Sequence, residues 1–97
     1  MTKADIIRAV SDMTGLTKVE VEAVLEGIIV SISNSLKRGE RVDIRGFGSF
    51  LVKRRAARDA RNPATSEIVK LKERFIPLFK VSKILKKDVN KSQLRGF

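Results

Sequence analysis

The side chains able to do chemistry in this chain are almost all cations. Its 97 residues include 21 lysines and arginines against 11 aspartates and glutamates, with a net charge of +10, no histidine and no cysteine. Without imidazole or thiol groups there is no His general base, no Cys/His nucleophile pair, no Cys/His zinc site and no disulfide. Cations in this number predict binding of a polyanion.

The positive charge belongs to the second half of the sequence. Residues 1–45 hold seven basic and seven acidic residues, whereas residues 46–97 hold 14 basic and four acidic ones. Charge that served only solubility would more naturally be spread over both halves, so the asymmetry favours a polyanionic partner. Asp43, Asp59 and Asp88 are scattered among bases and form no acid pair or metal cluster. We therefore expect no catalysis, no cofactor, no metal and no small-molecule substrate.

The densest cations lie in a segment that cannot join a core. Residues 53–61 have extended spacing, but their arginines fall on both parities, so neither face of a strand would be apolar. A turn cluster at residues 62–66 and a returning limb at residues 68–74 follow. The two limbs predict a long arm that projects into solvent, and about nine residues per limb reach on the order of 30 Å.

Two helices are predicted before the arm. A capping pattern at residues 2 and 5 precedes apolar residues at helical spacing that stop at Gly15, and a fuller capping box of Thr17 and Glu20 begins a longer helix that stops at Gly39. The longer helix is apolar around more of its circumference than one small partner helix can cover. Only about 65 residues remain outside the arm and tail, which is marginal for a single core, so we expect association with another subunit.

A hairpin is predicted between the second helix and the arm. Val42 and Ile44 alternate with charged residues and lead through a Gly-Phe-Gly turn at residues 46–48 into an apolar stretch at residues 49–52. The turn lacks the spacing of a phosphate-binding loop. The three phenylalanines of this region, Phe47, Phe50 and Phe79, are expected in the core rather than as stacking platforms for bases.

The chain is predicted to return to the body after the arm. Residues 76–79 favour a short strand, in which Pro77 requires an edge or irregular position. Ser82 is expected to cap a last helix with an apolar side and a lysine side, and residues 91–97 are expected to form a loose tail. Residues 1–90 are thus expected to form a single domain with an arm at about residues 53–74.

The order of these elements and two short motifs resemble the bacterial HU/IHF family of histone-like, DNA-bending proteins. The motifs are Gly46-Phe47-Gly48-Ser49-Phe50 and, at a fixed distance, Arg61-Asn62-Pro63-Ala64-Thr65, and the likeness runs from about Thr2 to Asn90 without a gap. The resemblance implies an α+β fold of HU/IHF type. This fold is an intertwined dimer. Each chain has two N-terminal helices, a three-stranded antiparallel sheet with a long protruding β-arm, and a short C-terminal helix.

The resemblance also implies a function: an architectural protein that binds double-stranded DNA in the minor groove, bends it and compacts the nucleoid. HU and IHF are standard examples of minor-groove proteins that kink the duplex with an apolar wedge. By position, Pro63 is expected to be this wedge, and the body lysines are expected to hold flanking phosphates. The expected DNA-binding residues are Lys3, Lys53, Arg54, Arg55, Arg58, Arg61, Asn62, Pro63, Lys70, Lys72, Arg74, Lys80, Lys83 and Lys86.

The sequence departs from the family pattern at three places. Ser66 stands where glycine is usual, Ala60 where glycine is common, and Val81-Ser82 where Pro-Gly is frequent. The arm tip is therefore expected to differ in shape. The sequence leaves open whether DNA binding is specific, as in the IHF branch, or general, as in the HU branch. It also leaves open whether the dimer partner is identical or a paralogous subunit.

Each of these features also has an interpretation in which it plays no part in binding a partner. The arginines of the arm could be a solvated charge run that prevents aggregation, Pro63 a simple turn former, and the lysines of the last helix an ordinary solvent face. Two other functions remain open, an RNA-binding module and a basic arm that docks on an acidic protein surface, although thin arms suit an A-form helix poorly. With no long apolar run and no signal-peptide pattern, we expect a cytoplasmic protein of the bacterial nucleoid and no membrane partner.

Overall fold

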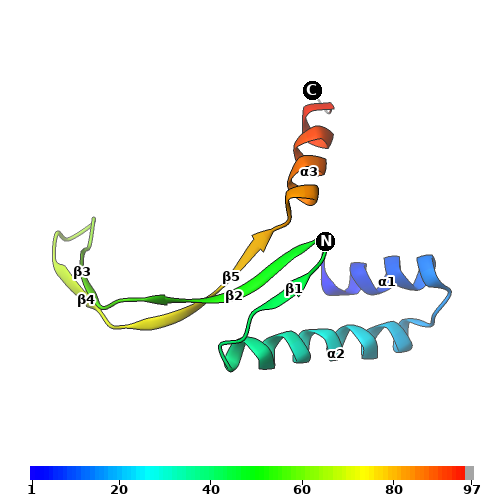
Figure 1. Ribbon diagram of the computed structural model, residues 1–97, viewed down its shortest axis with the longest axis horizontal. Helices are drawn as coiled ribbons and strands as arrows, with labels where there is room; N and C mark the ends of the chain where they lie inside the picture. The colour runs from blue at the N-terminus through cyan, green and yellow to red at the C-terminus, as the bar shows by residue number, and fades with distance from the viewer. Residues whose placement is uncertain (96–97) are drawn as a thin grey trace. The chain divides into compact units, whose positions relative to one another are not determined.

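The computed structural model of the protein describes residues 1–95 (Figure 1). The chain divides into two compact units, Met1–Ser35 and a second unit that begins at Leu36. The boundary falls in the last turn of the second helix.

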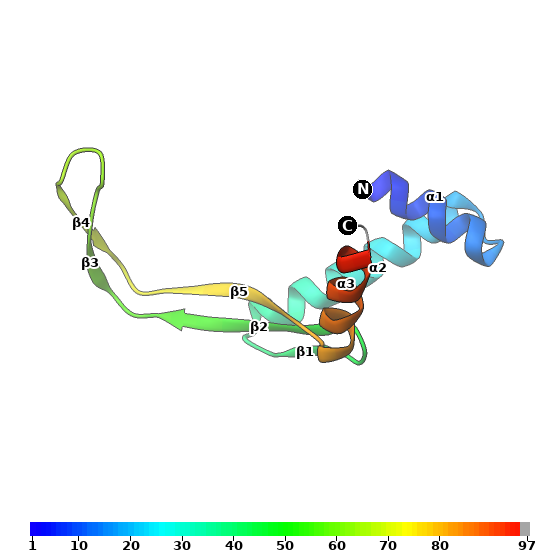
Figure 2. The same cartoon turned by 90° about the horizontal axis from the view of Figure 1, so that it is seen from above.

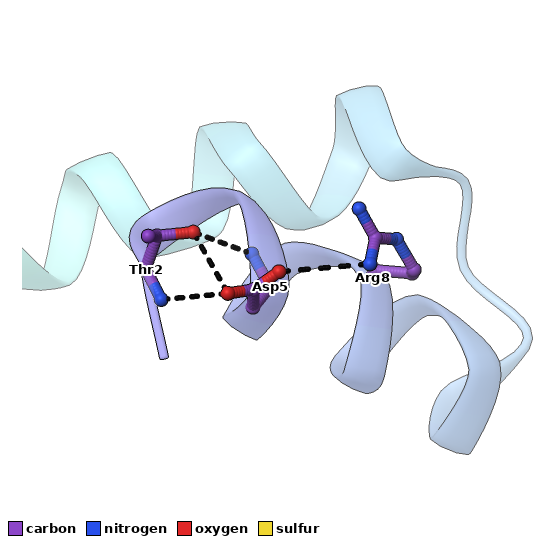
Figure 3. A network of polar contacts seen from close by, with 3 residues as sticks. All are labelled: Thr2, Asp5 and Arg8. Carbon is purple, nitrogen blue, oxygen red and sulfur yellow. Dashed lines mark hydrogen bonds and ion pairs between the residues drawn. The ribbon is translucent and has the colours of Figure 1, made fainter.

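The N-terminal unit begins with helix α1, Lys3–Thr14, which has the predicted capping box. The Thr2 hydroxyl accepts the Asp5 N–H at 3.3 Å, and the Thr2 N–H and hydroxyl both donate to the Asp5 carboxylate, at 2.9 and 3.0 Å (Figure 3). These two donors, the N–H first, hold the pKa of Asp5 below its usual value. Gly15 ends the helix with a left-handed φ of 78°, a conformation that costs glycine little.

Helix α2, Lys18–Lys37, begins with the second predicted capping box. The Thr17 N–H and hydroxyl donate to the Glu20 carboxylate at 3.1 and 2.9 Å, and the Thr17 hydroxyl accepts the Glu20 N–H at 3.2 Å. The helix leaves a long apolar surface uncovered within one chain. Val21 is the only buried apolar side chain among residues 1–95, whereas Val24 and Ile28 are 57% and 49% exposed.

The second unit contains a three-stranded antiparallel sheet of β1 (Val42–Ile44), β2 (Gly48–Arg55) and β5 (Arg74–Val81). The strand order is β1-β2-β5, so the predicted hairpin and the three-stranded sheet are confirmed. Pro77 lies on edge strand β5 opposite Val52, as its missing N–H requires. The strand is longer than the predicted residues 76–79 because it pairs with β2 along its whole length.

A second, two-stranded ladder of β3 (Arg58–Arg61) and β4 (Ile68–Leu71) continues the same two limbs outward (Figures 1 and 2). The extended segment expected to run unbroken from residue 53 to 61 is therefore interrupted after Arg55. The β2–β5 ladder stops where Arg55 lies directly opposite Arg74. Like charges at opposed positions destabilise strand pairing, which gives a physical reason for the interruption.

Helix α3, Lys83–Arg95, begins at the predicted cap, where the Ser82 hydroxyl accepts the Leu85 N–H at 3.1 Å. The predicted loose tail is wrong for residues 91–95, which continue this helix, while residues 96–97 lie outside the described part of the chain. No glycine or proline interrupts the sequence between Ser82 and Arg95, and lysine, glutamine and leucine all favour helix. No helix among residues 1–95 is long and apolar enough to cross a membrane.

Candidate nucleic-acid interface

The far end of the arm is closed by a short network of backbone hydrogen bonds. The Asn62 N–H donates to the Glu67 carbonyl and the Ser66 N–H to the Asn62 carbonyl, both at 2.8 Å, and the Asn62 side-chain oxygen accepts the Ala64 N–H at 2.9 Å. Pro63 follows Asn62 in this turn and is exposed. The tip therefore presents a rigid ring from a backbone whose own polar groups are largely satisfied.

Ser66 adopts a left-handed backbone, with φ of 60°, at the position where the resemblance predicts glycine. Serine can reach this region only at some steric cost. The closing bonds of the tip, from Ser66 and across Asn62 and Glu67, form around this residue nonetheless. Ser66 is therefore a strained residue of the tip, and the expected difference in tip shape from the family stays a prediction.

The distal ladder has two faces of different character. Residues directly opposite in an antiparallel pair share a face, so Arg58 and Leu71 lie on one side with Ala60 and Val69. The other side carries two cations, one acid and Ile68; the two cations are Arg61 and Lys70. Ala60 and Leu71 are half-buried, which corrects the expectation that neither face of the arm has apolar cover. The side that holds Arg58 is the less charged of the two.

Most arm cations have no carboxylate partner within residues 1–95. The exception is Arg54, whose Nε donates to Glu73 Oε1 at 2.9 Å across the two limbs. Arg55 faces Arg74 instead, so two cations meet at the base of the distal ladder. An anion placed between them would relieve this repulsion, and a backbone phosphate supplies one. The ion pair makes Arg54 the least available of the predicted arm residues.

A second cationic surface lies in the body, in a hollow at the start of α3. Asp43, Ser49 and Lys80 are consecutive partners across the three strands, which places them in one row on the same face. Arg41, Arg45 and Lys83 line the same hollow. Ser82 fixes the start of α3 there, because its N–H donates to the Phe47 carbonyl and its hydroxyl to the Gly46 carbonyl, both at 2.9 Å.

Asp43, the acid that lines this hollow, accepts hydrogen bonds from two neighbouring side chains. The Ser49 hydroxyl donates to the Asp43 carboxylate, and Arg41 Nε donates to it at 2.8 Å. Both bonds, the Ser49 bond first, hold the pKa of Asp43 below its usual value, so it is ionised at neutral pH. The hollow still has more positive than negative charge, which leaves room for an anionic ligand.

The Gly-Phe-Gly turn positions this hollow. Gly46 has a φ of 84°, which favours glycine, and a Cβ on Gly48 would lie 2.5 Å from the Lys80 carbonyl oxygen and 2.7 Å from the Phe79 ring. The Phe79 ring centroid lies 5.1 Å from that of Phe47 and 5.0 Å from that of Phe50. The three rings pack on one another, but Phe47 and Phe79 are 46% and 45% exposed within one chain, so the prediction that they lie in the core is wrong for the single chain. The absence of a side chain at Gly48 serves the close approach of β2 and β5.

Lys3 belongs to the N-terminal unit and forms an ion pair with Glu26. The remaining predicted residues, from Lys53 to Lys86, all belong to the second unit. Within that unit the structure separates them into an arm set and a body set, the body set being Lys80, Lys83 and Lys86.

The comparisons with known proteins agree with this arrangement. A family model described as bacterial DNA-binding protein matches residues 1–90. The chain belongs to this family. It is 44% identical to integration host factor subunit beta of Marinobacter nauticus, over the full length of both chains. It is 40% identical to the DNA-binding protein HU of Clostridium pasteurianum, with 94% of this chain and 100% of the relative covered.

Solved structures give the same family. The HU of an Anabaena HU–DNA cocrystal structure superposes with a TM-score of 0.84 at 32% identity, covering 92% of this chain and 97% of that one. The predicted HU/IHF resemblance and the predicted α+β fold are both confirmed. As a member of the bacterial DNA-binding protein family, the chain is an architectural DNA-binding protein and not an enzyme.

The DNA-binding residues predicted from the sequence do not include all the cations of the hollow at the start of α3. Arg41 and Arg45 were given no role, yet they line the hollow with Lys80 and Lys83. Arg41 and Arg45 flank β1 and alternate with Val42 and Ile44, a pattern that is visible in the sequence. The sequence does not show the register between β2 and β5, which brings the end of β5 beside Arg41 and Arg45.

Proposed function

We propose that this protein bends double-stranded DNA by inserting its arm into the minor groove, with Pro63 as the wedge and the body cations on flanking phosphates. The proposal rests chiefly on one observation: the two-stranded ladder of β3 and β4, whose cations have no carboxylate partner within residues 1–95, ends in an exposed proline held by a closed turn. We infer that its site of action is the bacterial nucleoid.

The dimensions of the ribbon connect groove binding to bending. The minor groove of B-DNA is about 6 Å wide, and the two backbones of a β-ribbon alone are about 4.8 Å apart. With side chains added, the ribbon needs a groove wider than that of straight DNA. Kinking toward the major groove opens the minor groove, so insertion and bending support each other.

The two faces of the distal ladder suit two surfaces of the groove. The side with Ala60, Val69 and Leu71 offers apolar contact to sugars and base edges, while Arg61 and Lys70 on the other side lie nearer to phosphates. Contacts of the second kind supply affinity without reading sequence. Arg58, on the apolar side, is the cation best placed to follow the negative potential of the groove.

The wedge requires an apolar group that does not yield when it meets a base step. Unstacking a step costs about a few kcal/mol, which the longer contact with bent DNA offsets. Pro63 has a fixed φ and no side-chain rotamers to lose, and the Asn62 bonds hold the turn beneath it.

We further infer that the working form is a dimer, with an identical chain or a paralogous subunit. Among residues 1–95 only Val21 is a buried apolar side chain, and large apolar residues on α2, β5 and α3 are exposed. An apolar surface of this extent marks an interface in a soluble protein. Two subunits would also present two arms, so that one duplex is kinked twice.

The bend angle of a duplex labelled at both ends, measured by fluorescence energy transfer, tests the wedge. Pro63→Ala is expected to reduce the bend while affinity for straight duplex changes little, because the cations remain. Pro77→Ala is the matched control, since Pro77 is the other proline of the chain and lies in β5. It is expected to leave the bend unchanged.

An unchanged bend in Pro63→Ala would contradict the wedge role. Equal losses of bend in both proline variants would also contradict it, because they would point to a general effect on the fold. Wild-type protein that binds duplex DNA without bending it would overturn the proposed function as a whole.

A further inference from the structure

Helix α3 carries a longer cationic ridge than the sequence-based prediction included. Lys83, Lys87 and Lys91 recur at every fourth position of a helix that continues to Arg95. Four residues turn an α-helix by about 400°, so the three side chains lie within about 80° of one another and span about 12 Å of its axis. All three are exposed.

The ridge carries uncompensated charge. Asp88 is the sole acid in α3, and no ion pair joins it to a lysine within residues 1–95. Lys83, Lys87 and Lys91 likewise have no carboxylate partner in that part of the chain. Three exposed lysines held in a row repel one another unless an anion lies along them.

The ridge is continuous with the body hollow. Lys83 lines the hollow that contains Arg41, Arg45 and Lys80, and it also lines the next hollow along α3 with Lys87. Ser82 fixes the direction in which the helix leaves the sheet through its two bonds to Gly46 and Phe47. Cations therefore follow one another from the end of β5 to the last turns of α3.

We propose that Lys87 and Lys91 are phosphate-binding residues that extend the body's grip on the DNA flanking the bend. This inference rests on the proposed function. Successive phosphates of one strand advance about 3.4 Å along the duplex axis, so a ridge of about 12 Å covers three or four of them. The helical continuation of residues 91–95, which the sequence did not predict, is what aligns Lys91 with the others.

The salt dependence of binding tests the proposal. Each phosphate contact contributes about −0.9 to the slope of log affinity against log salt concentration. Lys87→Gln combined with Lys91→Gln is expected to reduce the magnitude of the slope by up to about 1.8, and the corresponding arginine pair is expected to restore it. The control pair, Lys18→Gln with Lys37→Gln, removes the same charge from α2 and is expected to leave the slope near that of wild type.

A second measurement locates the contact. The chain has no cysteine, so Lys91→Cys gives one attachment point for an iron–EDTA label that cleaves nearby DNA backbone. Cleavage is expected in the flanking duplex, outside the segment that the arms protect. A glutamine pair that retains the wild-type slope, or a label that cleaves no flanking DNA, would overturn the inference. Failure of the wild-type protein to bind or bend duplex DNA would instead overturn the proposed function. The behaviour of the wild type therefore separates a failure of the proposed function from a failure of the role of Lys87 and Lys91 alone.

Discussion

The two units of the chain differ in net charge and in the share of their basic side chains that form ion pairs. Met1–Ser35 holds three basic and five acidic residues, and two of the bases, Lys3 and Arg8, are in ion pairs. The unit that begins at Leu36 holds 18 basic and six acidic residues, and its described ion pairs engage only Arg38, Arg41 and Arg54.

The contrast indicates that the two units need different partners. The N-terminal unit has little net charge but a large uncovered apolar surface along α2. It therefore needs a partner that covers this surface with apolar side chains of its own. The second unit has cations that nothing in residues 1–95 compensates, so what it lacks is a polyanion. The proposed dimer, with its two basic units on one duplex, would meet both needs.

The largest expected effect is on association. Ile28→Asp places a carboxylate in the centre of the apolar stripe of α2, where Ile28 is 49% exposed within one chain. A charge buried without a partner costs on the order of 3 kcal/mol or more, which raises the dimer dissociation constant about 100-fold. Sedimentation equilibrium measures this, with Asn34→Asp, on the opposite side of α2, as the control of equal charge. If Ile28→Asp stayed as dimeric as its control, the apolar surface of α2 would not be the surface through which the subunits associate.

The next effect is on DNA affinity. Arg58→Ala combined with Arg61→Ala is expected to reduce the magnitude of the salt slope by about 1.8. If affinities are equal at 1 M salt, that difference makes binding about 30-fold weaker at 0.15 M salt. Arg8→Ala with Lys18→Ala removes the same charge from the N-terminal unit and is expected to leave the slope close to wild type. Titration of a labelled duplex at several salt concentrations measures both, and equal slopes in the two double variants would contradict a division of roles between the units.

The smallest effect concerns the capping boxes. Thr17→Ala removes the cap of α2 and is expected to lower the free energy of unfolding by about 1 kcal/mol. Because hydrogen bonds from Thr17 lower the pKa of Glu20, that carboxylate stabilises the fold above its ordinary pKa and loses the contribution as pH falls through the lowered value. Thr17→Ala should therefore weaken the acid dependence of stability, measured by denaturant unfolding from neutral to acidic pH. An acid dependence equal to that of wild type would show that the cap does not set it.

The parts of the fold that the sequence predicted are those fixed by near neighbours. Both capping boxes connect residues three apart, and the helix end at Gly15 and the turn at Gly46 use the positive φ that glycine permits. The closed arm tip is equally local, since its bonds join residues 62–67. Such features depend little on the rest of the chain, so a single sequence carries enough information to place them.

The parts that were missed depend on register between distant segments. The interruption of the arm arises where Arg55 meets Arg74, a pairing that only the β2–β5 register brings about. The body hollow likewise needs Lys80 to lie in a row with Asp43 and Ser49. The continuation of α3 was missed for a different reason, because the motifs that carry the resemblance in the sequence end before residue 91 and give no information on the last residues of the helix.

Ring closure of a short DNA fragment measures whether the protein bends DNA. A linear duplex of about 100 base pairs is shorter than the persistence length of about 150 base pairs, so its ends seldom meet for ligation. If the arms kink the duplex as proposed, wild-type protein should raise the ring-closure rate by about tenfold or more, since a bend of this kind offsets at least about 1.4 kcal/mol of elastic cost. A closure rate that the protein leaves unchanged, at concentrations that saturate the fragment, would contradict the account.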